Sequence, residues 1–318
     1  MLINVIIAFF LDLVVGDPVF RYHPVRLIGS MLTLFERVYY RLRWKIFGGL
    51  LLVLNAILVV FCIILVMNWV KGFLYLPFSI NVLSVILLYF LFCNRDMTGE
   101  AKSVYYALED GDIERARKQV SRIVGRNTEP LDKRSIIRAT VESVAENVVD
   151  GFTAPLFWFG IGGFPLAYIY KTVNTIDSRF GYRNVRYERF GKVGARLDDA
   201  LNFIPARLNG VFLYCASGFK GEVLETMVKY ARAHPSPNSG ISEAGFSGFL
   251  GIRLCGPSTY EGVQKIKPWI GKDRLGEKEL EDPEIILKAV NFYWKVITVT
   301  LCIFLGALYL LPLPFVFK

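Results

Sequence analysis

Long apolar runs alternate with charged segments along the chain. The apolar runs are residues 1–15, 48–70, 74–93 and 293–317. A bilayer core about 30 Å thick takes roughly 20 apolar residues of α-helix, so these runs predict about four membrane-spanning helices. The second and third runs are separated only by a short turn, and we expect them to form a helical hairpin across the bilayer.

Two further apolar runs carry residues that interrupt helices. Residues 152–170 contain Pro155 and several glycines, and residues 200–219 contain Pro205 and the charged Arg207. Irregular backbone at membrane depth is tolerated where protein surrounds it or where it lines a cavity. Both runs are therefore predicted to be broken or re-entrant helices.

The distribution of charge tests this division, because cytoplasmic loops carry an excess of Lys and Arg. The chain has 37 basic and 28 acidic residues and a net charge of +9. If neither broken run crosses the bilayer, nearly all basic residues share one side. If both cross, only the basic block 171–198 is stranded, so this alternative stays open. We expect a multi-pass protein of the cell membrane whose polar chemistry lies on the cytoplasmic face.

The polar segments between the runs are predicted to be helical. Ile113, Ala116 and Val120 recur at helical spacing, and residues 137–148 repeat the pattern. No alternation typical of strands stands out, and residues 271–282 have the composition of an exposed loop. The predicted fold class is all-α, a single membrane-embedded domain over residues 1–318 with cytoplasmic helical segments at 94–150 and 220–290.

Composition excludes several kinds of protein. Five cysteines without a C-x-x-C pair disfavour a disulfide framework or a zinc finger, and two histidines are too few for a multi-histidine metal centre. A basic excess in so apolar a chain is typical of cytoplasmic loops rather than of a nucleic-acid surface.

Three carboxylates form the sharpest local signal. Glu142, Glu146 and Asp150 are spaced by four and share one helix face, and Arg134 and Arg138 extend the stripe. Such a stripe on a soluble helix is often a solvated face, but this one runs into an apolar segment, where unpaired carboxylates are costly. Mg²⁺ prefers hard oxygen ligands, so the three carboxylates are candidate metal ligands.

Further polar groups adjoin the broken runs. Lys171, Asn174 and Asp177 follow the first run, and Arg183 and Arg186 come soon after. Arginines beside acids suit the recognition of phosphate or carboxylate, although a basic loop that holds anionic lipid fits the same pattern.

The second broken run has its own charged group. Asp198 and Asp199 precede Arg207, whose charge inside an apolar segment indicates either an anion site or a structural ion pair. Two histidines, His23 and His234, each precede a proline in a rigid turn, and each is a candidate base or a structural residue.

These motifs together resemble the adenosylcobinamide-phosphate synthases, the CbiB/CobD-type membrane proteins of cobalamin biosynthesis that are also called cobyric-acid aminopropanol ligases. The similarity covers most of the chain. The motifs that carry it are Gly16-Asp-Pro, His23-Pro-Val, Glu142-Ser-Val-Ala-Glu-Asn-Val-Val-Asp150-Gly, Lys171-Thr-Val-Asn-Thr-Ile-Asp-Ser178, Leu197-Asp-Asp199, Asn202-Phe-Ile-Pro-Ala-Arg-Leu208, His234-Pro-Ser-Pro-Asn-Ser-Gly240 with Glu243-Ala, and Gly256-Pro. Members of that family often have Met where Arg179 stands and Gly where Cys255 stands.

The resemblance implies a ligase that uses ATP and Mg²⁺. It would join the free propionate of adenosylcobyric acid to the amine of (R)-1-amino-2-propanol O-phosphate or a related amino alcohol. The implied partners are these corrinoid and amino-alcohol substrates and the lipid bilayer, without nucleic acid; a homo-oligomer, or an assembly with other corrinoid-pathway membrane enzymes, stays open.

The resemblance also implies roles for individual residues. The catalytic candidates are His23, His234, Glu146 and Asp150. The substrate-binding candidates are Arg26, Lys171, Asn174, Arg183, Arg186, Arg207, Asn238 and Glu243. The candidates for the nucleotide are Asn147, Asp177, Asp198 and Asp199, and those for the metal are Glu142, Glu146 and Asp150.

Two other functions stay open. Acids spaced by four also hold Mg²⁺ and pyrophosphate in membrane prenyltransferases and phosphotransferases, although those enzymes typically have two such rows and this chain has one. Charged broken helices also occur in transporters of anions, here of a corrinoid, but transporters usually show paired repeats that this chain lacks.

Overall fold

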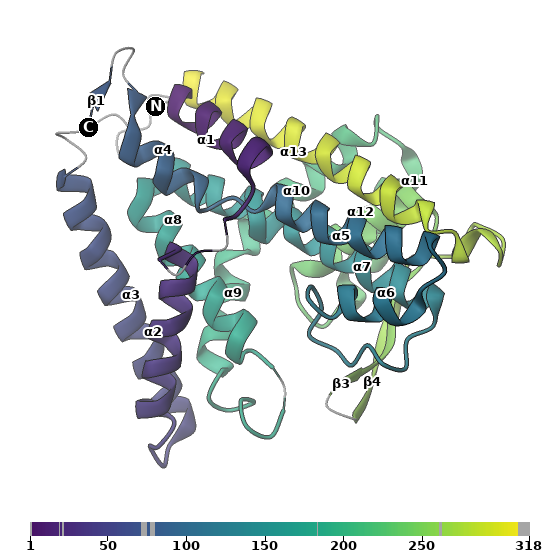
Figure 1. Ribbon diagram of the computed structural model, residues 1–318, viewed down its shortest axis with the longest axis horizontal. Helices are drawn as coiled ribbons and strands as arrows, with labels where there is room; N and C mark the ends of the chain where they lie inside the picture. Colours follow the sequence, from purple (N-terminus) through teal and green to yellow (C-terminus); the bar gives the residue numbers. More distant parts are fainter. Residues whose placement is uncertain are drawn as a thin grey trace. The chain divides into compact units, whose positions relative to one another are not determined.

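The structure, a computed structural model, describes residues 2–18, 20, 22–70, 75–76, 80–182, 184–260 and 263–310 (Figure 1). Its α-helices are, in chain order, α1 (Leu2–Val15), α2 (Pro24–Tyr39), α3 (Lys45–Val70), α4 (Val82–Tyr89), α5 (Asn94–Glu109), α6 (Ile113–Val120), α7 (Lys133–Val148), α8 (Ala154–Phe180), α9 (Lys192–Leu201), α10 (Phe203–Ala216), α11 (Gly221–Tyr230), α12 (Ser239–Leu250) and α13 (Glu284–Leu310). The predicted all-α class is confirmed.

Four helical stretches of the described chain are long and apolar enough to cross a membrane. They are Lys45–Met67, Val82–Glu109, Lys133–Phe180 and Glu284–Leu310. The expected number of about four is confirmed, but the set differs. The predicted span at residues 1–15 is a shorter apolar helix of 14 residues, α1.

Residues 152–170, the first of the two runs predicted to be broken helices, lie within the candidate membrane-spanning stretch Lys133–Phe180, which includes α8. Gly162 and Gly163 leave helical geometry, with φ values of −139° and +63°, and Pro165 follows them inside the helix. A proline lacks the N–H of a helical hydrogen bond, and glycine readily adopts positive φ, so the chain kinks here and then resumes its helix. The interruption is therefore a kink within a helix and not its end.

The predicted span at residues 74–93 was wrong in its details. The continuous helix here is only α4, which starts after Asn81, whose side chain accepts a hydrogen bond from the Ser84 N–H at 2.8 Å. An asparagine cap satisfies an N–H that the first turn leaves unpaired. Before it lies a short antiparallel pair, β1 (Tyr75–Leu76) and β2 (Ile80–Asn81), and after it residues 90–93 turn into α5.

The second broken run is interrupted as predicted. Helix α9 ends at Leu201, Asn202 forms a turn, and α10 begins at Phe203. Pro205 falls in the first turn of α10, where a missing N–H costs little.

The structure also contains strands that no alternation in the sequence indicates. An antiparallel hairpin joins β3 (Leu254–Tyr260) to β4 (Val263–Ile270), with Cys255 opposite Trp269 and a shift in register between Cys255 and Pro257. Gly256 and Pro257 produce that irregularity, and they also remove the alternation from the sequence. The predicted helical stretches at 113–123 and 137–148 are confirmed as α6 and α7, and residues 271–282 form the expected loop with one short 3₁₀ turn, η5 (Glu279–Glu281).

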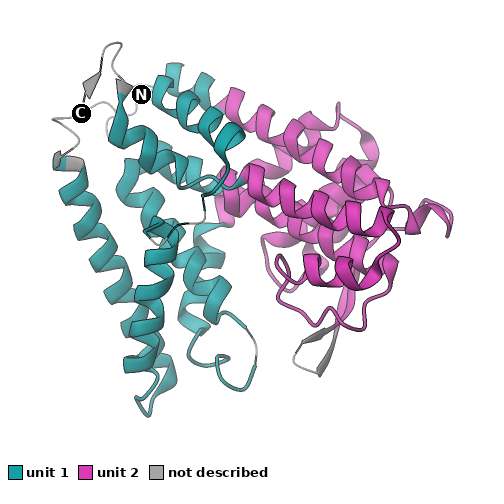
Figure 2. Cartoon of the chain, in the orientation of Figure 1, with its two compact units in different colours: residues 1–93, 154–202, 304–318 teal, residues 94–153, 203–303 magenta. Residues whose placement is uncertain are grey.

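The chain forms two compact units (Figure 2). Unit 1 comprises residues 1–93, 154–202 and 304–318, and unit 2 comprises residues 94–153 and 203–303. In unit 1, α3 packs against α2, α8 and α9. A Cβ at Gly49 of α3 would lie 1.9 Å from the Phe190 carbonyl oxygen, so this close packing requires glycine.

Unit 2 places α12 against α7, α10 and α11, and α5 against α6 and α7. Its core includes the fully buried Phe246 and Phe292, whose rings meet edge to face. Helix α7 continues into a π-helical turn, η3 (Val149–Thr153), which carries Asp150. Such π-helical turns are rare in proteins, and those that occur often lie at functional sites.

Candidate functional site

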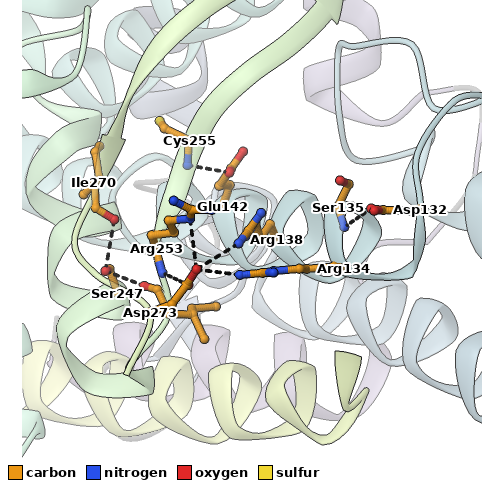
Figure 3. A network of polar contacts seen from close by, with 11 residues as sticks. Asp132, Arg134, Ser135, Arg138, Glu142, Ser247, Arg253, Cys255, Ile270 and Asp273 are labelled. Atoms are coloured by element: carbon orange, nitrogen blue, oxygen red, sulfur yellow. Dashed lines mark hydrogen bonds and ion pairs between the residues drawn. The ribbon is translucent and has the colours of Figure 1, made fainter. Parts of the chain in front are cut away.

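Glu142 of α7 connects three segments of unit 2. Its Oε1 accepts a hydrogen bond from the Cys255 backbone N–H at 2.8 Å, and its Oε2 pairs with the Arg126 guanidinium (Figure 3 shows the contact with Cys255). Arg126 also donates to the Ser258 hydroxyl at 3.1 Å. Glu142 is 6% exposed, so this charge is buried and paired, and it attaches the β3–β4 hairpin to α7.

Beside this contact lies a group that we call the His–Glu–Cys cluster, formed by His234, Glu243 and Cys255. Glu243 Oε2 lies 2.8 Å from the Cys255 Sγ, and Glu243 Oε1 lies 3.5 Å from His234 Nε2. His234 stands in the turn before α12, Glu243 within α12, and Cys255 in β3. His234 and Glu243 were predicted from one motif of the sequence, whereas Cys255 was not among the predicted site residues.

Burial governs the protonation of this cluster. Burial and, to a smaller extent, the charge of Lys267 together lower the pKa of His234 to about 4. Burial raises the pKa of Glu243 well above its usual range, and the charges of Glu142 and Glu146 act in the same direction. Burial and the charge of Glu243 raise the pKa of the Cys255 thiol. At neutral pH the imidazole is therefore neutral and the thiol protonated.

Basic residues balance the acids of this region. Lys267 of β4 lies within electrostatic range of Glu146, Glu243 and His234, and Arg126 within range of Glu146. The carboxylates of Asp150 and Glu142 also lie within electrostatic range of Glu146. The Glu146 side chain is exposed, in contrast to those of Glu142 and Glu243.

Arg207 is held against the His-Pro turn. Its Nη1 donates to the Asn238 Oδ1 at 2.8 Å and to the Phe203 carbonyl at 2.7 Å, and the guanidinium lies 3.5 Å from the centre of the Phe203 ring. Behind it the fully buried Asn209 donates to the Ser242 hydroxyl at 3.0 Å. These contacts fix α10 to the start of α12.

One turn before Glu142, three arginines surround a single carboxylate (Figure 3). Asp273 Oδ2 lies 2.6 Å from Arg134, 3.3 Å from Arg138 and 2.9 Å from Arg253, and its Oδ1 accepts the Arg253 N–H at 2.8 Å. Arg138 and Arg253 also lie over the Trp269 ring, at 4.8 and 4.1 Å. The group holds more positive than negative charge.

Unit 1 contains the remaining predicted residues that the structure describes. Buried His23 pairs with Asp17 at 2.6 Å, and its ring meets Phe90 edge to face at 4.8 Å. Arg26 is exposed on α2. Arg186 donates to Glu36 at 2.7 Å, so part of its guanidinium is already engaged.

Unit 1 also contains a hydrogen-bonded network of amide and carboxylate side chains. Asp198 of α9 accepts from Asn174 at 3.4 Å and from Asn202 at 3.0 Å, and the Tyr170 hydroxyl donates to Asn202 at 3.0 Å. Lys171, Asp177 and Asp199 are partly buried residues of α8 and α9. Arg183 lies outside the described residues.

The family model described as CobD/Cbib protein matches residues 5–293. The chain belongs to the CobD/Cbib family. The cobalamin biosynthesis protein CobD of Clostridium perfringens is 40% identical to it over 307 residues, 93% of this chain and 96% of the relative. The CobD of Klebsiella pneumoniae is 38% identical over 319 residues, 95% of this chain and 96% of the relative. No solved structure matches the chain.

The CobD/Cbib residues predicted from sequence divide between the two units. Unit 2 holds Glu142, Glu146, Asn147, Asp150, Arg207, His234, Asn238 and Glu243. Unit 1 holds His23, Arg26, Lys171, Asn174, Asp177, Arg186, Asp198 and Asp199. The site residues predicted from the sequence did not include Arg126, Lys267 or Asp273, because each lies far along the chain from its partners.

The predicted Mg²⁺ ligands do not form a compact cage. Within the described part of the chain, the compact group of potential ligand atoms is the His–Glu–Cys cluster and not Glu142, Glu146 and Asp150. Residues spaced by four are about 5–6 Å apart at Cβ, and Glu142 already accepts two hydrogen bonds. Glu146 and Asp150 remain oxygen donors suited to Mg²⁺ with substrate phosphates completing its coordination.

Proposed function

We propose that this CobD/Cbib protein acts in cobalamin (vitamin B12) biosynthesis as an ATP-dependent ligase. It would join the propionate of adenosylcobyric acid to the amine of (R)-1-amino-2-propanol O-phosphate, or to aminopropanol, and so form adenosylcobinamide phosphate or the corresponding amide. The observation that carries the proposal is the juxtaposition, in unit 2, of acids from two family motifs with the cations Arg126 and Lys267.

The reaction requires an activated carboxylate. A carboxylate does not condense with an amine at neutral pH, because hydroxide or oxide is a poor leaving group. In the proposed first step a propionate oxygen attacks the γ-phosphorus of ATP and ADP leaves, which gives an acyl phosphate. The neutral amine then attacks the acyl carbon, phosphate leaves with its bonding electron pair, and one proton is released from the nitrogen.

The acids and cations of unit 2 suit the charges in these steps. Glu146 and Asp150 would hold Mg²⁺, which when bound neutralises the phosphates of ATP. Arg126 and Lys267 lie within electrostatic range of Glu146 and would provide fixed positive charge for a transferred phosphoryl group. The three arginines around Asp273 add a second cationic group one helical turn away, suited to a further phosphate.

The two histidines suit positioning better than proton transfer. The His234 side chain is 7% exposed, and its nitrogens face Ser236 and Glu243 within the protein. His23 is buried against Asp17. We therefore propose that an exposed carboxylate, Glu146, meets the substrate, while His234 positions Glu243 and α12.

The proposed location is the cytoplasmic face of the cell membrane. ATP is a cytoplasmic substrate, and the excess of Lys and Arg is typical of loops on that side. The four helices long and apolar enough to cross a membrane are consistent with a multi-pass protein.

The proposal is tested with full-length protein in detergent. Protein is incubated with adenosylcobyric acid, amino-alcohol phosphate, Mg²⁺ and ATP, and the mass of the corrinoid product is measured by mass spectrometry. We expect the mass of one new amide and one ADP per amide. Glu146→Gln should lower the rate roughly a hundredfold or more, whereas Glu225→Gln, at an exposed position of α11, should leave it unchanged.

Two outcomes would overturn the proposal. One is the absence of amide product with either amine although the protein is folded. The other is corrinoid flux across vesicles without consumption of ATP, which would favour a transporter. Equal rates for Glu146→Gln and Glu225→Gln would reject the assigned site while leaving the reaction intact.

A further inference from the structure

The His–Glu–Cys cluster has the composition of a transition-metal site. One potential ligand atom each from His234, Glu243 and Cys255 lies within 4.8 Å of the other two. These atoms come from three separate parts of unit 2: the turn before α12, α12 itself and β3. The three residues are not spaced along one helix, so they lie close together only because of the tertiary structure.

One nitrogen of the His234 imidazole, Nε2, faces the cluster without a hydrogen-bond partner. His234 Nε2 is buried and makes no hydrogen bond, and its distance of 3.5 Å from Glu243 Oε1 exceeds the usual range for one. The side chains of His234 and Glu243 are 7% and 3% exposed. A buried polar nitrogen of this kind costs free energy unless something binds it.

The other ring nitrogen fits the second shell of a metal site. In one tautomer His234 Nδ1 accepts a hydrogen bond from the Ser236 N–H at 3.0 Å, and in the other it donates one to the Ser236 carbonyl oxygen at 3.3 Å. With the proton on Nδ1, the ring donates to the carbonyl and directs the Nε2 lone pair at the cluster. Histidine ligands of metals commonly donate their other N–H to a backbone carbonyl in this way.

The backbone holds the thiol in place. Cys255 has a φ of +61°, a conformation that residues with a side chain rarely adopt. Its N–H is bound by Glu142, and it pairs with Trp269 across the hairpin. The surrounding structure therefore fixes the direction of the Cα–Cβ bond that aims Sγ at Glu243.

The donor set selects the kind of ion. Imidazole, carboxylate and thiolate together are typical ligands of zinc-class ions, whereas Mg²⁺ and Ca²⁺ favour oxygen alone. Bond lengths of about 2.0–2.3 Å in a tetrahedral site put neighbouring ligand atoms roughly 3.3–3.8 Å apart. In the structure Sγ lies 2.8 Å from Glu243 Oε2, Nε2 lies 3.5 Å from Glu243 Oε1, and the three ligand atoms lie within 4.8 Å of one another, so shifts of about 1 Å bring them to these separations.

We propose that His234, Glu243 and Cys255 bind one zinc-class divalent ion through Nε2, a carboxylate oxygen and Sγ. Binding releases the thiol proton to solvent, and any proton on Glu243 leaves with it. Three protein ligands leave a fourth position for water. The site lies beyond the proposed ligase chemistry and requires neither ATP nor corrinoid.

The test uses full-length protein purified through a tag without histidine and treated with a chelator. Co²⁺ and then Zn²⁺ are added, and the near-ultraviolet absorption of cobalt bound to thiolate is recorded. We expect one equivalent of Co²⁺ to give this absorption and Zn²⁺ to remove it. Cys255→Gly should abolish the absorption and weaken Zn²⁺ binding roughly tenfold or more, and His234→Gln should weaken it similarly.

Glycine is the suitable replacement because it adopts the positive φ of Cys255 without strain. Cys215→Ser is the matched control, since Cys215 also belongs to unit 2 but is not part of the cluster. The inference is overturned if Co²⁺ gives no thiolate absorption with the parent protein. It is equally overturned if Cys255→Gly binds Zn²⁺ as tightly as Cys215→Ser.

Discussion

Replacement of Asp273 by Asn removes the carboxylate that pairs with three arginines, Arg134, Arg138 and Arg253. Loss of one partner from a fully buried ion pair costs about 3–5 kcal/mol, whereas exposed pairs contribute about 0.2–1 kcal/mol. The Arg138 side chain is 11% exposed and Arg253 38%, so this group lies between the two limits. We expect Asp273→Asn to lower the free energy of unfolding by about 2–3 kcal/mol.

Asparagine keeps an oxygen that accepts the Arg253 N–H, so the change isolates charge from backbone contact. At about 2–4 °C per kcal/mol for a chain of this size, Tm should fall by roughly 4–12 °C in a thermal unfolding experiment in detergent. The control is Asp110→Asn, because Asp110 and Arg115 are 61% and 50% exposed. The control should move Tm by about 4 °C or less. An equal shift for both variants would refute the reasoning.

Other substitutions test local structure by the same unfolding measurement. Gly99→Ala in α5 should raise stability by about 0.5–1 kcal/mol, since a Cβ there meets nothing within 4 Å, and a decrease would contradict this. Gly271→Ala should cost about 1 kcal/mol or more, because φ is +80° and the new Cβ would lie 1.8 Å from the Ser247 hydroxyl oxygen; no loss would show that the turn is not as described. Asp132→Ala removes the N-cap of α7 and should cost about 1 kcal/mol. Hydrogen bonds from Ser135 lower the pKa of Asp132, so the difference from Ala should persist above the ordinary Asp pKa of about 4 and shrink as the pH falls through the lower folded-state value. A difference that instead grew in acid would contradict this sign.

The sequence predicted best what depends on neighbouring residues. The 3.6-residue period located α6 and α7, and the apolar runs gave the all-α membrane class. It predicted worst the features that form only when two segments distant in the sequence contact each other. The β3–β4 hairpin has no clean alternation, because Gly256 and Pro257 interrupt the pattern, and its contact with Glu142 is specified only by tertiary structure.

The same distinction applies to the candidate site. Glu142, Glu146 and Glu243 were singled out from motifs, and the structure places Glu142 and Glu146 within electrostatic range of Glu243. Arg126 and Lys267 carried no local signal, since a basic residue in a basic chain is ordinary until its partner is known. Cys255 stood out only as a departure from the family, and its contact with Glu243 depends on a positive φ that no spacing reveals.

The proposed activation of the carboxylate is tested most directly by isotope transfer. Adenosylcobyric acid labelled with ¹⁸O in its free carboxylate is converted with ATP, Mg²⁺ and amino-alcohol phosphate, and the phosphate and nucleotide products are analysed by mass spectrometry. An acyl phosphate requires one ¹⁸O to appear in inorganic phosphate and none in ADP. Unlabelled phosphate, or ¹⁸O in AMP, would contradict phosphoryl activation.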